Sequence, residues 1–183
     1  MSEKTWLLLK SRLNYAIIII KQRFGGGYVI RVAIVDDIIE ICGQIENYLH
    51  NISNRRGIEI EAEPYLSGER FCDALQNGEV FDIIFLDIEL KSMNGIDVSK
   101  FIREVLEDEL QQIVFISAKQ QYSMELHSFH PLDFLVKDIK EAEVEVVLQR
   151  FMKIKGIWSE TFECKIGADI KKIKIKEIRY LSV

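Results

Sequence analysis

Residues 81–87 read Phe-Asp-Ile-Ile-Phe-Leu-Asp, a short apolar run that ends in an acid, and this pattern decides the fold. Three more apolar runs end in a charged or hydroxyl-bearing residue: residues 31–35 at Asp36 and Asp37, residues 113–116 at Ser117, and residues 134–136 at Lys137. Near-continuous apolar runs rich in Ile, Val and Phe are typical of parallel strands that helices cover on both faces. The carboxyl ends of such strands meet at one edge of the sheet. The pattern therefore predicts a site at that edge suited to a divalent metal and a phosphoryl group.

Helical patterns fill the intervals between the apolar runs, because apolar residues recur there at three- and four-residue steps. The predicted buried faces are Ile38, Ile41, Ile45, Leu49 and Ile52, then Phe71 and Leu75, then Val98, Ile102 and Val105, and finally Val144, Val147, Leu148 and Phe151. Residues 58–63 alternate instead between apolar and acidic, which predicts a half-exposed edge strand. Five strand–helix units between Val32 and about Ile154 predict a doubly wound α/β domain with a five-stranded parallel sheet.

Length and charge favour one full domain with a short appendage. The chain has 183 residues and a formal net charge of -5, which argues against nucleic-acid binding by the whole chain. From Arg150 onward, however, Lys and Arg outnumber Asp and Glu by nine to four. The three cysteines are far apart and lack Cys-x-x-Cys spacing, so neither a disulfide framework nor a zinc site is indicated. We expect a reducing cytoplasmic location.

The first 29 residues form a separate N-terminal extension. Residues 16–20 are apolar, but Lys10, Arg12 and Asn14 interrupt the stretch before them, which falls short of the roughly 18 apolar residues of a membrane span. We therefore expect no membrane association. Two interpretations stay open: a short amphipathic helix, or a translation start near Val29.

The strand-end residues together resemble the phosphoacceptor site of the receiver domain of two-component response regulators. The resemblance covers about residues 30 to 152, within a domain that we bound at 30–154. It is carried by the acid pair, Asp87, Ser117 and Lys137, and by the supporting sequences Leu86-Asp-Ile-Glu-Leu90, Met93-Asn-Gly95, Ile116-Ser-Ala118 and Phe134. A single acid after an apolar strand is often only a helix cap, whereas five matching positions are specific. The implied fold is the flavodoxin-like receiver fold.

The resemblance implies a role for each of these residues. Asp87 would be the phosphoacceptor that attacks the phosphohistidine of a sensor histidine kinase. Ser117 and Lys137 would contact phosphoryl oxygens, and Ser117 with Phe134 would form the switch. Mutually repelling carboxylates need a cation, and the implied cofactor is Mg²⁺. Its predicted ligands are Asp37, Asp87 and the backbone carbonyl of Glu89, with Asp36 acting through water. A homodimer through the receiver is a further implied partner.

Two positions depart from the family pattern. The residue after the lysine is usually a proline with a cis peptide bond, but here it is Asp138. Because a cis bond without proline costs about 3 kcal/mol, a trans bond and a differently placed loop are expected. The usual tyrosine is Phe134, which packs but carries no hydroxyl.

The C-terminal residues 155–183 predict a linker and part of an output domain. Residues 161–166 and 171–176 alternate polar with apolar and predict two strands joined at 167–169. With Glu177-Ile-Arg-Tyr-Leu181 they resemble the opening of a LytTR-type DNA-binding domain, which implies transcription control. A lysine-rich, solvated hairpin is the alternative interpretation. We expect the module to stop after two or three strands, so that DNA binding needs a complete output domain and is not expected of this chain.

Two other functions compete with this hypothesis. The first is a stand-alone receiver that acts by protein binding alone. The second is an aspartyl-phosphate-forming phosphatase, because Asp87-x-Glu89 resembles the paired acids of those enzymes. The phosphatases usually continue to a threonine or valine, where this chain has Leu90, and their scheme has no place for the acid pair at 36–37. We therefore expect a phosphoacceptor that hydrolyses its phosphoryl group slowly, and not an enzyme acting on other substrates.

Overall fold

The computed structural model describes residues 28–119, 122, 126–157, 161–166 and 169–174. The interpretations of the N-terminal extension fall on residues outside this part of the chain, apart from Tyr28 and Val29. None of the helices in the described part is long and apolar enough to cross a bilayer.

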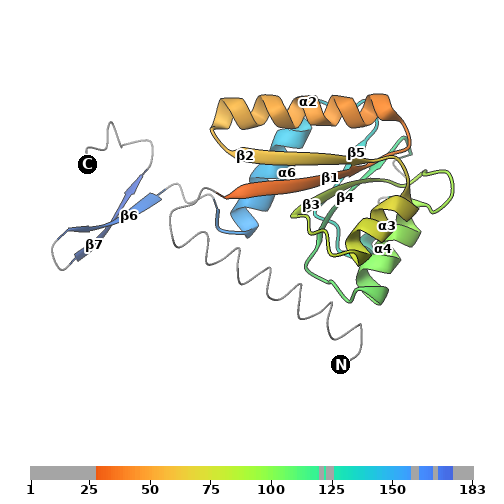
Figure 1. The fold of residues 1–183 in the computed structure, drawn as a ribbon. Coiled ribbons are helices and arrows are strands. Elements are labelled where there is room, and N and C mark those ends of the chain that lie inside the picture. Colours follow the sequence, from red (N-terminus) through yellow and green to blue (C-terminus); the bar gives the residue numbers. More distant parts are fainter. Residues whose placement is uncertain (1–27, 120–121, 123–125, 158–160, 167–168, 175–183) are drawn as a thin grey trace.

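A five-stranded parallel sheet forms the centre of the domain (Figure 1). Its strands are β1 (Val29–Val35), β2 (Glu59–Tyr65), β3 (Ile83–Asp87), β4 (Gln112–Ser117) and β5 (Asp133–Val136). Their spatial order is β2-β1-β3-β4-β5, so that the alternating strand β2 lies at an edge, as predicted. From β1 the chain first adds β2 on one side and then β3, β4 and β5 on the other, so the strand order reverses between β1 and β3. Doubly wound sheets bind their ligands at such a reversal. The predicted doubly wound α/β fold is confirmed.

Helices cover both faces of the sheet. One face packs against α2 (Ile39–Arg56) and α6 (Glu141–Ile154), whose buried residues include Ile45, Leu49, Val147 and Phe151. The other face packs against α3 (Gly68–Gln76), α4 (Gly95–Lys100) and the π-helical turn η1 (Phe101–Val105) that continues α4. A short 3₁₀ turn, η2 (Leu126–Phe129), precedes β5. Each face of the central strands therefore contributes to its own apolar core, which makes their positions rigid.

Two predicted core positions are wrong. Ile38 is exposed because it precedes α2 as its N-cap and does not belong to the helix. Val105 is 48 % exposed because η1 is a π-helical turn with i to i+5 hydrogen bonds. In it the backbone N–H of Leu106 donates to the carbonyl of Phe101. The wider turn rotates Val105 off the face that Val98 and Ile102 share. It buries Arg103 instead.

The C-terminal strands form the predicted hairpin. Strands β6 (Thr161–Ile166) and β7 (Asp169–Lys174) pair antiparallel, with Ile166 opposite Asp169. Strand β7 begins two residues earlier than the alternation indicated, because its pairing with β6 already includes Asp169. Residues 175–183 lie outside the described part, so the assignment of 155–183 to a LytTR-type module stays a prediction.

Candidate functional site

Three carboxylates meet at the carboxyl edge of the sheet. Strands β1 and β3 are hydrogen-bonded neighbours in which Val35 pairs with Leu86, so Asp36 and Asp87, one residue further along, leave the sheet side by side. The side chains of both acids are buried, with 0 % and 1 % exposure. One oxygen from each of Asp36, Asp37 and Asp87 lies within 4.8 Å of the others. The structure thus brings the three predicted acids together.

Lys137 pairs with both buried acids and partly neutralises their charge. Its Nζ donates a hydrogen bond to Asp87 Oδ2 at 3.0 Å and lies 3.2 Å from Asp36 Oδ2. Burial alone would lower the pKa of Lys137, but the hydrogen bond to Asp87 and the charges of both acids outweigh it and raise the pKa. The ammonium therefore stays protonated at neutral pH. The pKa of Asp36 is raised, first by burial and then by the charge of Asp87, although the Ile38 N–H and Lys137 oppose the shift.

Two buried carboxylate oxygens lack a hydrogen bond within the described residues. These atoms are Asp36 Oδ2, which has only the ion pair with Lys137, and Asp87 Oδ1. A buried acceptor that stays unsatisfied costs about 1–3 kcal/mol. A hard divalent cation prefers oxygen ligands of this kind. The donor set and its two unsatisfied oxygens therefore fit Mg²⁺.

Ser117 lies on the neighbouring strand at the same level. Asp87 pairs with Ile116 across β3 and β4, so the next residue, Ser117, is buried beside the acid cluster. The Ser117 hydroxyl accepts a hydrogen bond of 3.0 Å from the backbone N–H of Lys119. The Ser117 carbonyl accepts one of 2.9 Å from the backbone N–H of Lys137. The backbone thus links the predicted hydroxyl to the predicted amine.

The Asn94-Gly95 turn fixes the loop that follows Asp87. A Cβ atom on Gly95 would lie 2.3 Å from the carbonyl oxygen of Asp87, so only glycine allows this approach. The backbone N–H of Gly95 donates to the carbonyl of Ile88 at 3.1 Å. The Asn94 side chain accepts from the N–H of Asp97 at 2.9 Å and caps α4. The nucleophile candidate therefore sits on a strand end whose exit is held in one conformation.

Three charged side chains line the rim of the cluster. Lys119 pairs with Glu89 across the ends of β3 and β4. Lys91 pairs with Asp37 at 3.1 Å, a contact that was not predicted from the sequence. The predicted contribution of Glu89 is its backbone carbonyl, and that ligand stays a prediction. The position of Lys91, four residues beyond an acid in a loop, carries no periodic signal from which the pairing follows.

Phe134 lies on β5, whereas Lys137 and Asp138 follow directly after the end of that strand. Phe134 is half-buried and packs against the core that covers the α3 and α4 face. None of the described peptide bonds is cis, so Lys137 and Asp138 are joined by a trans bond, as expected. Asp138 has a φ of 76°, a left-handed conformation that proline cannot adopt. The chain therefore aims Lys137 by a backbone route different from the one that the family pattern implies.

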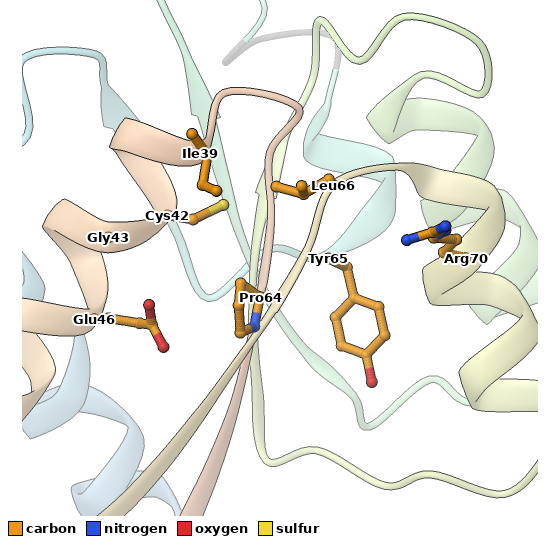
Figure 2. Close-up of a pocket in the computed structure, with 8 residues that line it drawn as sticks. All are labelled: Ile39, Cys42, Gly43, Glu46, Pro64, Tyr65, Leu66 and Arg70. Carbon is orange, nitrogen blue, oxygen red and sulfur yellow. The ribbon is translucent and has the colours of Figure 1, made fainter.

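A groove of about 420 Å³ lies between the first turns of α2 and the end of β2 (Figure 2). It is lined by Ile39, Cys42, Gly43 and Glu46 of α2, by Pro64, Tyr65 and Leu66 at the end of β2, and by Arg70 of α3. The Cys42 thiol donates to the carbonyl of Asp36 at 3.4 Å. Burial, and then the charge of Asp36, raises the pKa of Cys42 to about 11, so this cysteine is not a thiolate nucleophile at neutral pH.

Comparison with known proteins agrees with this geometry. A family model described as the response regulator receiver domain matches residues 32–149. The chain therefore belongs to the response regulator receiver domain family. Its fold is similar to that of the response regulatory domain of mrkE from Klebsiella pneumoniae, at a TM-score of 0.60 and 21 % identity, covering 70 % of this chain and all of that one. The likeness to the chemotaxis protein CheY4 of Vibrio cholerae has a TM-score of 0.56, with 22 % identity and coverage of 67 % and 98 %. The flavodoxin-like receiver fold is confirmed.

Curated relatives carry names from signal transduction. The sensory transduction protein LytT of Bacillus subtilis is 29 % identical over 126 residues, which cover 69 % of this chain and 49 % of that protein. The transcriptional regulatory protein LytR of Staphylococcus aureus is 28 % identical over 76 residues, covering 42 % of this chain and 30 % of LytR. The chain thus spans half or less of the length of these relatives. Receiver domains generally bind Mg²⁺ at an acidic pocket, and this chain has such a cluster of aspartates.

Proposed function

We propose that this chain is the receiver of a two-component phosphorelay and accepts a phosphoryl group on Asp87 from a sensor histidine kinase. The observation that carries the proposal is the asymmetry of the Asp87 carboxylate. Lys137 holds Oδ2, whereas Oδ1 is buried without a hydrogen bond among the described residues. One oxygen is therefore anchored, and the lone pairs of the other remain available for attack on phosphorus.

The acid cluster would hold the cation that phosphoryl transfer needs. Asp37, Asp87 and the backbone carbonyl of Glu89 would bind Mg²⁺ directly, and Asp36 would bind it through water. When bound, Mg²⁺ supplies positive charge that neutralises the phosphoryl oxygens. The closeness of the three carboxylates and the unsatisfied Asp36 Oδ2 support this assignment.

In the transfer, an Asp87 oxygen forms a bond to phosphorus as the bond between phosphorus and the kinase histidine nitrogen breaks. The electron pair of that bond leaves with the histidine. Lys137, already protonated and next to Asp87, can then pair with a phosphoryl oxygen. The buried Ser117 hydroxyl is free to rotate and donate a hydrogen bond to another phosphoryl oxygen. The protein's part is thus to hold charge and donors in place, with no proton transfer by a general base.

The proposal also includes a switch and an output. Ser117 moves toward the phosphoryl group, and Phe134, which is only half-buried, moves inward behind it. We propose that this change alters self-association of the receiver and controls transcription through a LytTR-type domain, of which hairpin β6–β7 is the beginning. The names of the relatives LytT and LytR support such an output. A cytoplasmic location belongs to the same proposal.

The ion pair of Glu89 argues against the alternative function, an aspartyl-phosphate-forming phosphatase. A phosphatase would need the Glu89 carboxyl as a general acid for the leaving group. In this structure its carboxylate is already engaged in an ion pair with Lys119 at the rim.

Phosphorylation by acetyl phosphate in the presence of Mg²⁺, followed by intact-protein mass spectrometry, tests the proposal. We expect the parent chain to gain one phosphoryl group and the Asp87→Asn variant to gain none. Asp73→Asn is the matched control, because Asp73 is an exposed acid on α3 and its loss changes the net charge equally. Single phosphorylation of Asp87→Asn at the parent rate would contradict the proposal.

A further inference from the structure

Lys91 pairs with the one acid of the cluster that Lys137 does not reach. Its Nζ lies 3.1 Å from Asp37 Oδ2, and its side chain is 82 % exposed while that of Asp37 is 12 % exposed. We propose that Lys91 is a resident counter-cation on Asp37 that an incoming divalent cation must displace, so that it sets the metal affinity of the receiver. The inference rests on the proposed function, because it takes the acid cluster as the metal site.

The loop between β3 and α4 holds Lys91 over Asp37. Leu90 is buried in the core, so the next side chain along the loop leaves the core toward the rim. The loop is also fixed further along, because the backbone N–H of Met93 donates to Glu69 Oε1 at 3.0 Å. The backbone around Lys91 therefore leaves its ammonium within reach of Asp37.

Two lysines share the three acids of the cluster. Lys137 forms ion pairs with Asp36 and Asp87, whereas Lys91 forms one with Asp37. A divalent cation bound by Asp37 would repel an ammonium on the same carboxylate. Lys91 can yield, because an exposed side chain returns to water at little cost. Lys137 is only 22 % exposed and is held by two acids, so it is not the lysine that leaves.

The size of the effect follows from the exposure of Lys91. An exposed ion pair stabilises its partners weakly, so removing it should tighten metal binding about two- to fivefold at low ionic strength. Added salt screens the pair and should shrink the difference. The device therefore adjusts metal affinity and does not create or abolish the site.

Binding of Mn²⁺ to the full chain, measured by electron paramagnetic resonance of the free ion and repeated with Mg²⁺ as competitor, tests the inference. The variants are Lys91→Gln, Lys91→Arg and, as the matched control, Lys100→Gln. Lys100 is also an exposed lysine paired with an acid, Asp97 at 3.9 Å, but that acid is outside the cluster. We expect tighter binding by Lys91→Gln, parent-like binding by Lys91→Arg, and no change in Lys100→Gln.

The outcomes separate the two proposals. If the parent binds Mn²⁺ in a manner that Asp87→Asn weakens, and Lys91→Gln matches Lys100→Gln, the role of Lys91 is overturned and the phosphoacceptor site stands. Weaker binding by Lys91→Gln would overturn it equally. A parent chain with no saturable, Asp87-dependent binding would contradict the metal site of the proposed function and remove the inference with it.

Discussion

The carboxyl edge of the sheet has an acceptor side and a response side that differ in how firmly they are held. The acceptor side comprises the ends of β1 and β3, with Asp36, Asp37 and Asp87, and every residue of β3 is buried. The response side comprises the ends of β4 and β5, with Ser117, Phe134 and Lys137. Strand β5 has four residues, of which only Leu135 is buried. The proposed nucleophile is thus placed on rigid backbone, and so is Ser117 on the buried strand β4. Phe134 and Lys137, in contrast, lie on or next to β5, where few apolar contacts oppose movement.

The largest expected effect comes from breaking the rigidity of the acceptor side. Gly95→Ala should lower the free energy of unfolding by about 3 kcal/mol or more, because the new Cβ would lie 2.3 Å from the carbonyl oxygen of Asp87. Gly43→Ala is the control, since a Cβ there meets nothing within 4 Å and Gly43 lies inside α2. It should raise the free energy of unfolding by about 0.5–1 kcal/mol. Urea unfolding measures both, and a Gly95→Ala variant as stable as the parent would mean that the loop after Asp87 yields.

The next effect compares one variant from each side, for which different changes in the free energy of unfolding are expected. Lys137→Met should lower the free energy of unfolding of the metal-free protein by about 1–3 kcal/mol, because it leaves two buried carboxylates unpaired. Asp87→Asn should leave it unchanged or raise it by about 1 kcal/mol, because it relieves carboxylate repulsion and its amide oxygen still accepts from Lys137.

Thermal or urea unfolding with a chelator present measures this pair of variants. Lys153→Met, which removes an exposed lysine in the last turn of α6, is the control and should change the free energy of unfolding by less than about 0.5 kcal/mol. Added Mg²⁺ should stabilise Lys137→Met more than the parent, because the variant leaves more uncompensated negative charge. Equal losses for Lys137→Met and Asp87→Asn would show that the buried pair is held by packing and not by charge.

Much of this architecture could be predicted from the sequence. The apolar runs gave the central strands because strands buried on both faces need no alternation. Glu59, Glu61 and Glu63 alternate with apolar residues, as in a strand that is exposed on one face, and this placed β2 at an edge. The meeting of Asp36 and Asp87 followed from the rule that parallel strands end at the same edge. These inferences share one property, which is that they depend on backbone periodicity alone.

Features that depend on local backbone conformation could not be predicted. The π-helical turn that exposes Val105 and buries Arg103 has no periodic signature. The Arg103 guanidinium donates to the carbonyls of Asp108, Gln111 and Phe129, a set of acceptors known only once the fold is built. The pairing of Lys91 with Asp37 likewise depends on the path of one loop. Such contacts require knowledge of where separate segments meet in space.

The rim should affect phosphoryl lifetime more than phosphorylation itself. Glu89 and Lys119 each lie two residues beyond a site residue and pair across the cluster, where water would approach the phosphoryl group. Glu89→Ala and Lys119→Ala should therefore change the dephosphorylation rate severalfold, the scale of an exposed ion pair, while both variants still accept the phosphoryl group. Decay of the phosphorylated mass over time measures this rate. Decay of both variants at the parent rate would place the pair outside the path of the attacking water.

The smallest expected effect concerns Asp138 on the response side. Its φ of 76° is a conformation in which an L side chain is strained and glycine is not. Asp138→Gly should therefore raise the free energy of unfolding by up to about 1 kcal/mol, whereas Asp138→Val should lower it by about 1–2 kcal/mol. Asp73→Gly, inside α3, is the control and should lower it by about 0.5–1 kcal/mol. Urea unfolding ranks the three variants. If Asp138→Gly were less stable than the parent, the Asp138 side chain, and not the left-handed backbone, would fix the loop that aims Lys137. The end of β5 would then be more firmly held than the single buried residue of that strand indicates.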